Sequence, residues 1–297
     1  LSGNFDFSTE DKFSPTYTFG KGTTSPSSGS SAANQNFYTV IRNFLTYNHS
    51  FDQLHLNALA GHESQESTFE NVSGGRRNFP SNDVQGLNSG DATTATNSGD
   101  NSQSNPTGGS AQESWFGRIN FSLNDRYLLT TNIRTDGSSN FPSNNRWVTT
   151  YSGGFAWKIN NESFLKNVKS INELKLRLGY GQTNNQGIPG NTFITQLASV
   201  ANGLSGTAQF QNNLANPFVQ WEKTDDYNAG IDGTFLNERL SFTVDVYDRE
   251  TNGLLLQVPL PEYSGTVAGW GPGSMQAPYA NVGSLSNKGF DFQINST

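Results

Sequence analysis

The sequence has no cysteine, a single methionine and few charged residues, which make up 14% of its 297 positions. Without cysteine, neither a disulfide scaffold nor a thiolate zinc site can form. No apolar run approaches the ~20 residues that a membrane-spanning helix needs. The net charge of −7, with no basic stretch in the chain, argues against nucleic acid as a partner.

Aromatic and small polar residues are frequent, whereas cysteine is absent and charged residues are few. Aromatic residues reach 12%, with 21 phenylalanines, although only 33% of the chain is hydrophobic. Disordered chains are also poor in apolar residues, but they usually carry high charge and few aromatic residues. Outer-membrane barrels have this composition because only half the side chains of their strands must be apolar. Secreted β-sandwiches fit it as well, so composition leaves both classes open.

The most informative segment is Trp115–Asp136, which predicts two alternating strands joined by a tight turn at Asn124-Asp125. One face of the hairpin is mainly apolar and the other mostly polar over about ten residues, the length of a tilted membrane-spanning strand. We therefore expect a barrel wall, with Ile119 facing lipid. The expected apolar face carries Trp115, Gly117, Ile119, Phe121, Leu123, Tyr127, Leu129, Thr131 and Ile133.

Strand pairs separated by long polar loops recur along the chain. The expected strands are Phe37–Tyr47, Gln53–Ser64, Trp147–Ile159, Glu173–Gln182, Trp221–Phe235, Arg239–Arg249 and Gly289–Ile294. The expected long loops are Glu70–Gln112, Thr183–Phe218 and Thr251–Ala280, and Glu162–Val168 predicts one short helical turn. Short turns that alternate with long loops are typical of membrane barrels. A sandwich would space its strands more evenly, but alternation is a weak signal per strand, so both architectures remain at this point.

Ordered motifs narrow the choice. They closely resemble the SusC/RagA family of TonB-linked outer-membrane proteins of Bacteroidetes, in the order and at the spacing of that family, most strongly from Trp115 to Ile294. The segments that carry the resemblance are Gly117–Leu129, Arg134–Phe141, Asn144–Trp147, Leu174–Gly181, Asn216–Thr224, Asn228–Asp232, Arg239–Tyr247, Leu254–Leu256, Pro259–Pro261 and Asn287–Phe290.

The resemblance implies an all-β fold: an antiparallel transmembrane β-barrel portion with long extracellular loops, about ten strands of a larger, plugged barrel of 22 strands. Residues 1–297 would then be part of a TonB-dependent receptor barrel domain, with a plug and a TonB box expected upstream of it. It also implies TonB, a SusD-like surface lipoprotein as a lid, outer-membrane lipid around the wall, and an oligosaccharide or peptide substrate. The implied location is the outer membrane of a Gram-negative, Bacteroidetes-type cell.

The ends of the chain suggest an internal fragment. Leu1 lies beside the alternating Phe5 and Phe7, and Thr297 directly follows the strand-like run Gly289–Ile294. An open sheet cannot span a bilayer, because each unpaired edge amide or carbonyl in hydrocarbon costs several kcal/mol. We therefore expect the edges to pair with further strands.

Candidate site residues fall into two groups. The inward charges are Arg118, Arg134, Lys175 and Arg177, which either line the lumen or brace the wall through salt bridges to a plug or to neighbouring strands. The loop aromatics Tyr263, Trp270 and Tyr279 are candidates for contact with substrate or lid, since aromatic faces stack on sugar rings and anchor interfaces. Packing within the loops is the alternative for them.

No catalytic, metal or cofactor site is expected. His49, His55 and His62 have no zinc spacing, and His55 and His62 point to opposite sides of a strand. Asp225 and Asp226 also point to opposite faces, which is poor geometry for a pair of catalytic carboxylates.

Three functions remain. The first is TonB-dependent import of oligosaccharides or peptides, and the second is a cell-surface β-protein that does not transport, such as an adhesin or a glycan-binding module. A secreted glycan-active enzyme ranks last, because no carboxylate pair can be placed; we expect no enzyme.

Overall fold

The computed structural model describes residues 2–15, 17–19, 23–101, 109–166, 168–202, 206–264 and 275–296. The chain forms two units: residues 1–41 with 65–111, and residues 42–64 with 112–297. The strands β4 (Ser28–Phe51) and β5 (Leu54–Arg77) pass through both. No helix in the described part of the chain has the length and apolar character needed to cross a membrane.

The first unit is built from polar strands. In it β1 (Ser2–Ser14) pairs antiparallel with β4, and β6 (Asp91–Asn101) pairs with β5. The short hairpin of β2 (Tyr17–Phe19) and β3 (Thr23–Ser25) and the 3-10 turn η1 (Leu87–Ser89) complete it. Its small core lies around Phe79, which is buried, donates its backbone N–H to Ser27 Oγ at 2.9 Å and packs edge-on against Phe13.

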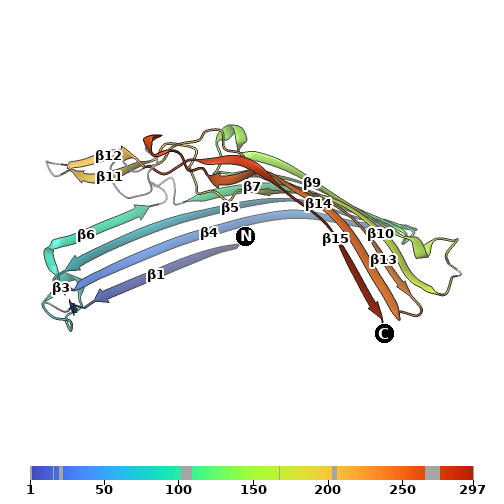
Figure 1. The fold of residues 1–297 in the computed structure, drawn as a ribbon, viewed down its shortest axis with the longest axis horizontal. Helices are drawn as coiled ribbons and strands as arrows, with labels where there is room; N and C mark the ends of the chain where they lie inside the picture. Colours follow the sequence, from blue (N-terminus) through green and yellow to red (C-terminus); the bar gives the residue numbers. More distant parts are fainter. Residues whose placement is uncertain are drawn as a thin grey trace. The chain divides into compact units, whose positions relative to one another are not determined.

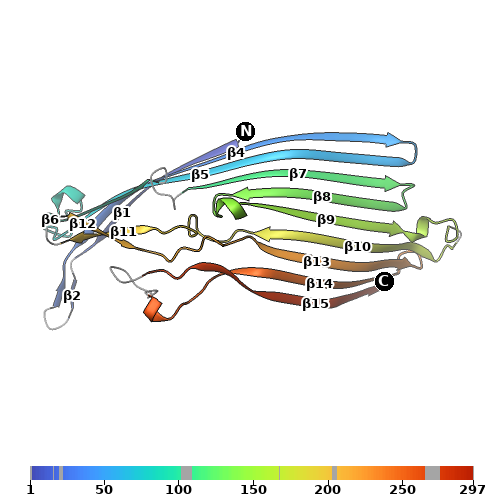
Figure 2. The ribbon, with the colours of Figure 1, turned by 90° about the horizontal axis from the view of Figure 1, so that it is seen from above.

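The main sheet of the second unit is antiparallel, with the strand order β4-β5-β7-β8-β9-β10-β13-β14-β15, and Figure 2 shows these strands from β7 to β15 side by side in this order. The strands β11 and β12 form a separate two-stranded sheet. The barrel is not closed in this chain, and no pairing in its described part joins β15 to β4. The remaining strands of the unit are β7 (Ser110–Leu123), β8 (Tyr127–Ser138), β9 (Trp147–Lys158), β10 (Ile171–Asn185), β11 (Leu197–Asn202), β12 (Gly206–Gln211), β13 (Glu222–Phe235), β14 (Leu240–Gln257) and β15 (Tyr279–Ser296).

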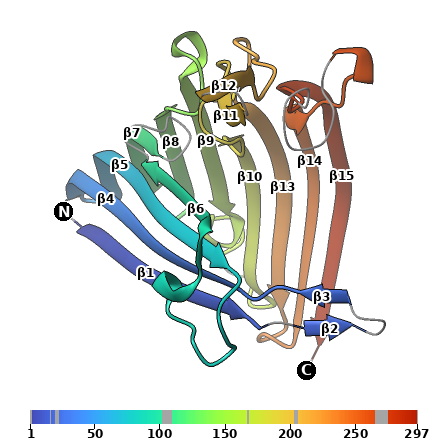
Figure 3. The same ribbon diagram turned by 90° about the vertical axis from the view of Figure 1, so that its left-hand side faces the viewer.

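Short turns and long connections lie at opposite ends of this sheet (Figures 1 and 2). Asn124 and Asp125 join β7 to β8 with φ of 56° and 50°, as the tight hairpin turn predicted there requires. Leu236, Asn237 and Glu238 join β13 to β14, also with positive φ. The other end carries the long connections between β10 and β13 and between β14 and β15, and Figure 3 shows the β11–β12 hairpin at this end, which is turned towards the viewer. Three further 3-10 turns are η2 (Ser143–Asn145), η3 (Ile159–Asn161) and η4 (Glu262–Ser264).

All three predicted long loops are wrong in part. The stretch Glu70–Gln112 holds the end of β5, all of β6 and the start of β7. Thr183–Phe218 holds the end of β10 and the β11–β12 hairpin, and Thr251–Ala280 holds the end of β14 and the start of β15. The end of β5 and all of β6 have few apolar residues. An alternation argument finds only strands that have one apolar side, so it cannot detect them. The turns over Glu162–Lys166 agree with the predicted helical turn, since Lys166 N–H donates to Glu162 O at 3.0 Å.

The registers of the sheet sort its side chains into two faces. The apolar face contains the predicted set of the β7–β8 hairpin, because Gly117 pairs with Ile133, Ile119 with Thr131 and Phe121 with Leu129. The same face continues through the register across β9, β10, β13, β14 and β15. Large apolar side chains left exposed along it include Trp115, Ile119, Leu129, Ile133, Tyr151, Leu178, Tyr227, Val246, Phe290, Phe292 and Ile294. A continuous exposed apolar face of this extent needs apolar surroundings.

Aromatic pairs mark two levels of the apolar face. Tyr127 and Trp157 have ring centroids 6.4 Å apart near the short-turn end, and Phe235 stacks on Phe242 at 5.7 Å at the same end. Towards the long-loop end, the ring centroids of Tyr180 and Tyr227 are 4.9 Å apart. Two aromatic levels with aliphatic residues between them match the interfacial girdles of membrane barrels.

A buried carboxylate fastens the short-turn end of β8 and β9. Glu162 accepts hydrogen bonds from Tyr127 Oη at 2.6 Å, Trp157 Nε1 at 3.0 Å and Arg126 Nη1 at 3.1 Å. The bonds from Tyr127 and then Trp157, with the charge of Arg126, lower the pKa of Glu162 from its ordinary value of 4.5.

This lowered pKa predicts an acid-sensitive contribution to stability. Because the folded pKa of Glu162 lies below its unfolded pKa, the contribution is complete above about pH 5 and disappears as the pH falls through the folded pKa. Chemical unfolding of the full-length protein should show the wild type more stable than Glu162→Gln at neutral pH, with the two converging in acid. A difference that stays constant down to about pH 3 would contradict this origin.

Candidate functional site

The polar face of the second unit carries all four of the predicted inward charges. On β7 and β8, Arg118 pairs with Asn132 and Phe116 with Arg134, opposite to the apolar set. On β10, Lys175 and Arg177 share the polar face with their partners Asp232 and Gly230 on β13. The structure thus places these cations on one side of the sheet, spread over several strands.

Arg177 joins three strands. Its Nε and Nη2 donate to the two carboxylate oxygens of Asp232 on β13 at 2.7 and 2.9 Å, and its Nη2 also reaches Asp245 on β14 at 3.1 Å. Thr243 Oγ1 donates to Asp232 at 3.2 Å. The guanidinium crosses β13 at Gly230, where an added methyl group would overlap Asp245 Oδ1 and lie 2.7 Å from Arg177 Nη2. The glycine therefore makes room for the bridge.

Arg134 is the centre of a second polar cluster. It donates from Nε to Asp136 Oδ1 at 2.7 Å and from Nη2 to Ser114 Oγ at 2.9 Å, and it lies over the Phe116 ring at 5.4 Å. Asn184 Nδ2 adds a bond to Asp136 Oδ2 at 3.1 Å. Both Arg134 and Arg177 therefore have carboxylate partners on the wall itself.

Arg118 and Lys175 differ from these two. Within the described ranges of the chain neither forms an ion pair, and Arg118 is exposed on the polar face. A further ion pair joins Arg249 Nη2 to Asp226 Oδ2 at 2.5 Å, between β13 and β14. The polar face thus combines paired charges, which stiffen the wall, with Arg118 and Lys175, which are available to other groups.

Large side chains on this face lie flat over glycines of neighbouring strands. A methyl group added at Gly61 would overlap the Phe116 ring, and one added at Gly179 would overlap the Asn228 amide. Tyr247 covers Gly289 in the same way, its hydroxyl 2.5 Å from the place of an added methyl group. Each of these bulky side chains occupies the space above a glycine and therefore lies along the surface of the wall.

At the long-loop end, the β8–β9 and β10–β13 connections share one buried core with residues of β9 and β14. Its centre is the ring pair Phe141 and Trp221, with centroids 4.6 Å apart. Trp221 Nε1 donates to Arg146 O at 3.1 Å, and Asn145 Nδ2 donates to Val219 O at 3.2 Å, which ties the β8–β9 connection to the β10–β13 connection. We call this group the mouth core; its members are Phe141, Val148, Ile188, Val219, Trp221 and Leu255.

The three loop aromatics predicted as contact residues have different positions. Tyr279 packs against the mouth core and is partly buried, and its carbonyl accepts a 2.7 Å bond from Asn216 Nδ2. Tyr263 is 92% exposed. Trp270 lies outside the described residues. The structure does not bring Tyr263 and Tyr279 into a common pocket.

Sequence reasoning missed the mouth core as a unit. Phe141, Val219 and Trp221 all occur in motifs that carried the family resemblance, but Phe141 and Val219 stand outside the expected strands, and Trp221 is only the first residue of the strand expected over Trp221–Phe235. Their only signal is large apolar residues within otherwise polar loop motifs. Such a signal shows that a residue is buried but does not identify its partners.

The histidines and paired aspartates have separate partners. His62 Nε2 lies 3.1 Å from Glu113 Oε1, and His55 Nδ1 lies 2.8 Å from Ser50 Oγ. Asp225 accepts bonds from Tyr180 and Gln182, whereas Asp226 pairs with Arg249. Over the described positions, no group of three or more His, Cys, Asp or Glu side chains could hold a metal ion.

We expect Trp221→Phe to loosen the mouth core without unfolding the wall. The substitution keeps ring packing against Phe141 but removes the donor to Arg146 O, a loss of about 1 kcal/mol. Limited proteolysis of the full-length protein should then cut the β10–β13 connection faster, with the unfolding midpoint of the barrel little changed. Unchanged cleavage would show that the indole N–H does not hold this loop.

An open antiparallel wall with one apolar, girdled face and one charged face is a segment of an outer-membrane β-barrel. Residues 1–297 match the family described as TonB dependent receptor-like, beta-barrel, and the chain belongs to this family. It is of the SusC/RagA type found in the outer membrane of Bacteroidetes. We infer that the apolar face is the lipid-facing side and that the polar face is the interior side.

Individual relatives agree with this assignment. The chain is 35% identical to TonB-dependent receptor P3 of Formosa agariphila over 263 residues, 87% of this chain and 25% of the relative. It is 40% identical to TonB-dependent receptor SusC of Bacteroides thetaiotaomicron over 190 residues, 62% of this chain and 18% of the relative. Among solved structures, the RagAB peptide transporter superposes with a TM-score of 0.82 at 25% identity, covering 99% of this chain and 31% of that chain. The chain thus spans a quarter or less of the curated relatives just named.

Proposed function

We propose that the protein containing this chain is a TonB-dependent nutrient importer that takes up oligosaccharides or peptides through the barrel. The proposed importer also includes a plug and a TonB box upstream of residue 1. A SusD-like lipoprotein covers its long loops. The supporting observation is the interior face, where paired charges stiffen the wall and Arg118 and Lys175 remain available. The relative named TonB-dependent receptor SusC supports TonB dependence, and the RagAB peptide transporter supports peptides as a class of substrate.

The importer proposal is tested by uptake in cells. Cells producing the full-length protein should accumulate a labelled oligosaccharide or peptide substrate, and a protonophore or deletion of TonB should abolish the accumulation. Purification in mild detergent should also recover a surface lipoprotein with the barrel. Binding of the same ligands at the cell surface without energy-dependent uptake would reject import, and would favour a glycan-binding surface protein.

Arg118 provides a prediction within this proposal. Arg118→Ala should lower uptake and leave the free energy of unfolding within about 0.5 kcal/mol of wild type. The reason is that Arg118 is exposed and has no ion pair in the described part of the wall. Ser122→Ala, a small change on the same face of β7, is the control and should leave uptake unchanged. Equal uptake by Arg118→Ala and wild type would remove Arg118 from the interior pathway.

A further inference from the structure

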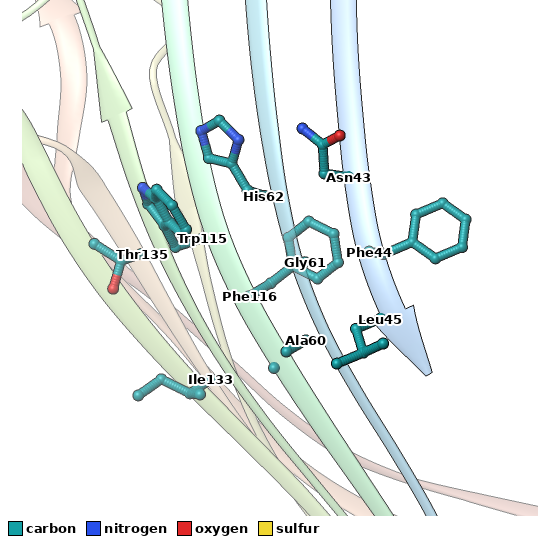
Figure 4. A pocket seen from close by; sticks show the side chains of 11 residues that line it. Asn43, Phe44, Leu45, Ala60, Gly61, His62, Trp115, Phe116, Ile133 and Thr135 are labelled. Atoms are coloured by element: carbon teal, nitrogen blue, oxygen red, sulfur yellow. The ribbon is translucent and has the colours of Figure 1, made fainter. Parts of the chain in front are cut away.

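A groove interrupts the lipid-facing side between β4 and β8. Alternation puts Ala58 and Ala60 of β5 on the same side as His62, whose ring packs at a tilt of 38° against Trp115 of β7. Gly117 and Ile119 of β7 share that side. Figure 4 shows Leu45 of β4 and Ile133 of β8 on either side of Ala60, so small residues on β5 and β7 lie between larger ones on the flanking strands.

The groove is large and continuous. Its two parts have volumes of about 690 and 480 Å³, within the ~300–1,000 Å³ range of ligand sites. Both parts are lined by Leu45, Ala60, Gly117 and Ile133, so one leads into the other. Leu45 and Ile133 stand three strand spacings apart, roughly 14 Å, with only a methyl group and a hydrogen on the two strands between them.

The two ends of the groove differ in polarity. The end towards the long loops carries Trp115, whose ring centroid lies 4.2 Å from that of His62, and His62 Nε2 lies 3.1 Å from Glu113 Oε1. The other end, towards the short turns, is bounded by Tyr47, Ile119 and Tyr151. Arg118 and Asn132 line this part as well, but alternation directs their side chains to the interior face.

We propose that this groove binds one acyl chain of an outer-leaflet glycolipid of the lipid A class. The groove is continuous with the lipid-facing surface, and its side chains in the bilayer are apolar. Its polar end points towards the long loops, the side that faces the outer leaflet in barrels of this kind. An acyl chain that enters from that leaflet has its headgroup near His62 and Glu113 and its tail along Ala60 and Gly117. The site is independent of the imported substrate.

Filling variants test the site. Gly117→Leu has room, since an added Cβ would lie 3.6 Å from Ile133 Cγ2 and 3.7 Å from Leu59 O, in ordinary contact. Ala60→Leu fills the same groove from β5. The control is Ala229→Leu, which adds the same bulk to the lipid-facing side of β13, away from the groove. Native mass spectrometry of the detergent-solubilised full-length proteins, titrated with purified lipid A, counts the bound molecules. Migration of unheated samples on gels shows that each variant is folded.

We expect wild type and Ala229→Leu to bind one lipid A molecule, and both filling variants to bind it about tenfold more weakly, as the loss of contact with about two methylene groups predicts. Equal binding by all four proteins would mean non-specific surrounding lipid only and would overturn the site. Retention of a phospholipid in preference to lipid A by wild type would overturn the assignment to the outer leaflet.

Discussion

Replacing Gly230 by valine is expected to destabilise the full-length barrel by about 3 kcal/mol. The new side chain would occupy the space through which Arg177 crosses β13 to Asp245, so it either overpacks the wall or leaves a partly buried aspartate without its partner. The ion pair is about one-third exposed, which puts the effect at the low end of the range for buried pairs. Guanidinium unfolding in detergent measures it.

The matched control lies on the same face of the adjacent strand. Gly181 of β10 pairs with Asp226, and a methyl group added there meets nothing within 4 Å, so Gly181→Val should change the free energy of unfolding by less than about 0.5 kcal/mol. In an Arg177→Met background, Gly230→Val should cost much less than alone, because the bridge is already absent. Additive effects in this cycle would show that Gly230 acts on something other than the bridge.

The second large effect is expected on the other face. Ile119→Arg should lower the free energy of unfolding in lipid by about 2–4 kcal/mol, the range for an arginine near the bilayer midplane on the lipid side of a barrel. Ile119 is half exposed on the apolar face and pairs with Thr131. Unfolding in phospholipid vesicles measures the loss, and Ile119→Leu should behave as wild type. An arginine variant as stable as wild type would mean that this face does not contact lipid.

Alternation predicted which way each side chain of the β7–β8 hairpin points, because an apolar side and a polar side differ at every residue of such strands. The positions of Ile119 and Arg118 on opposite faces follow from this alone. The same rule put Arg177 on the polar face. It could not supply the partners Asp232 and Asp245, because the register between β10, β13 and β14 depends on turns that alternation does not describe.

Other parts of the fold had no detectable signal. The strand β6 and the distal part of β5 are largely polar on both sides, so alternation does not predict them as strands. The mouth core brings Phe141 of the β8–β9 connection together with Trp221 of the β10–β13 connection and Leu255 of β14. Contacts between loops far apart in sequence are set by the arrangement of the strands, and no local pattern encodes them.

The glycines beneath Phe116, Asn228, Arg177 and Tyr247 give the interior surface low relief, since each bulky side chain lies along the wall and projects little from it. On the same face, Arg134 and Arg177 form their ion pairs with carboxylates of the wall itself. The stiffness of the wall therefore comes from hydrogen bonds and ion pairs that lie within its own surface.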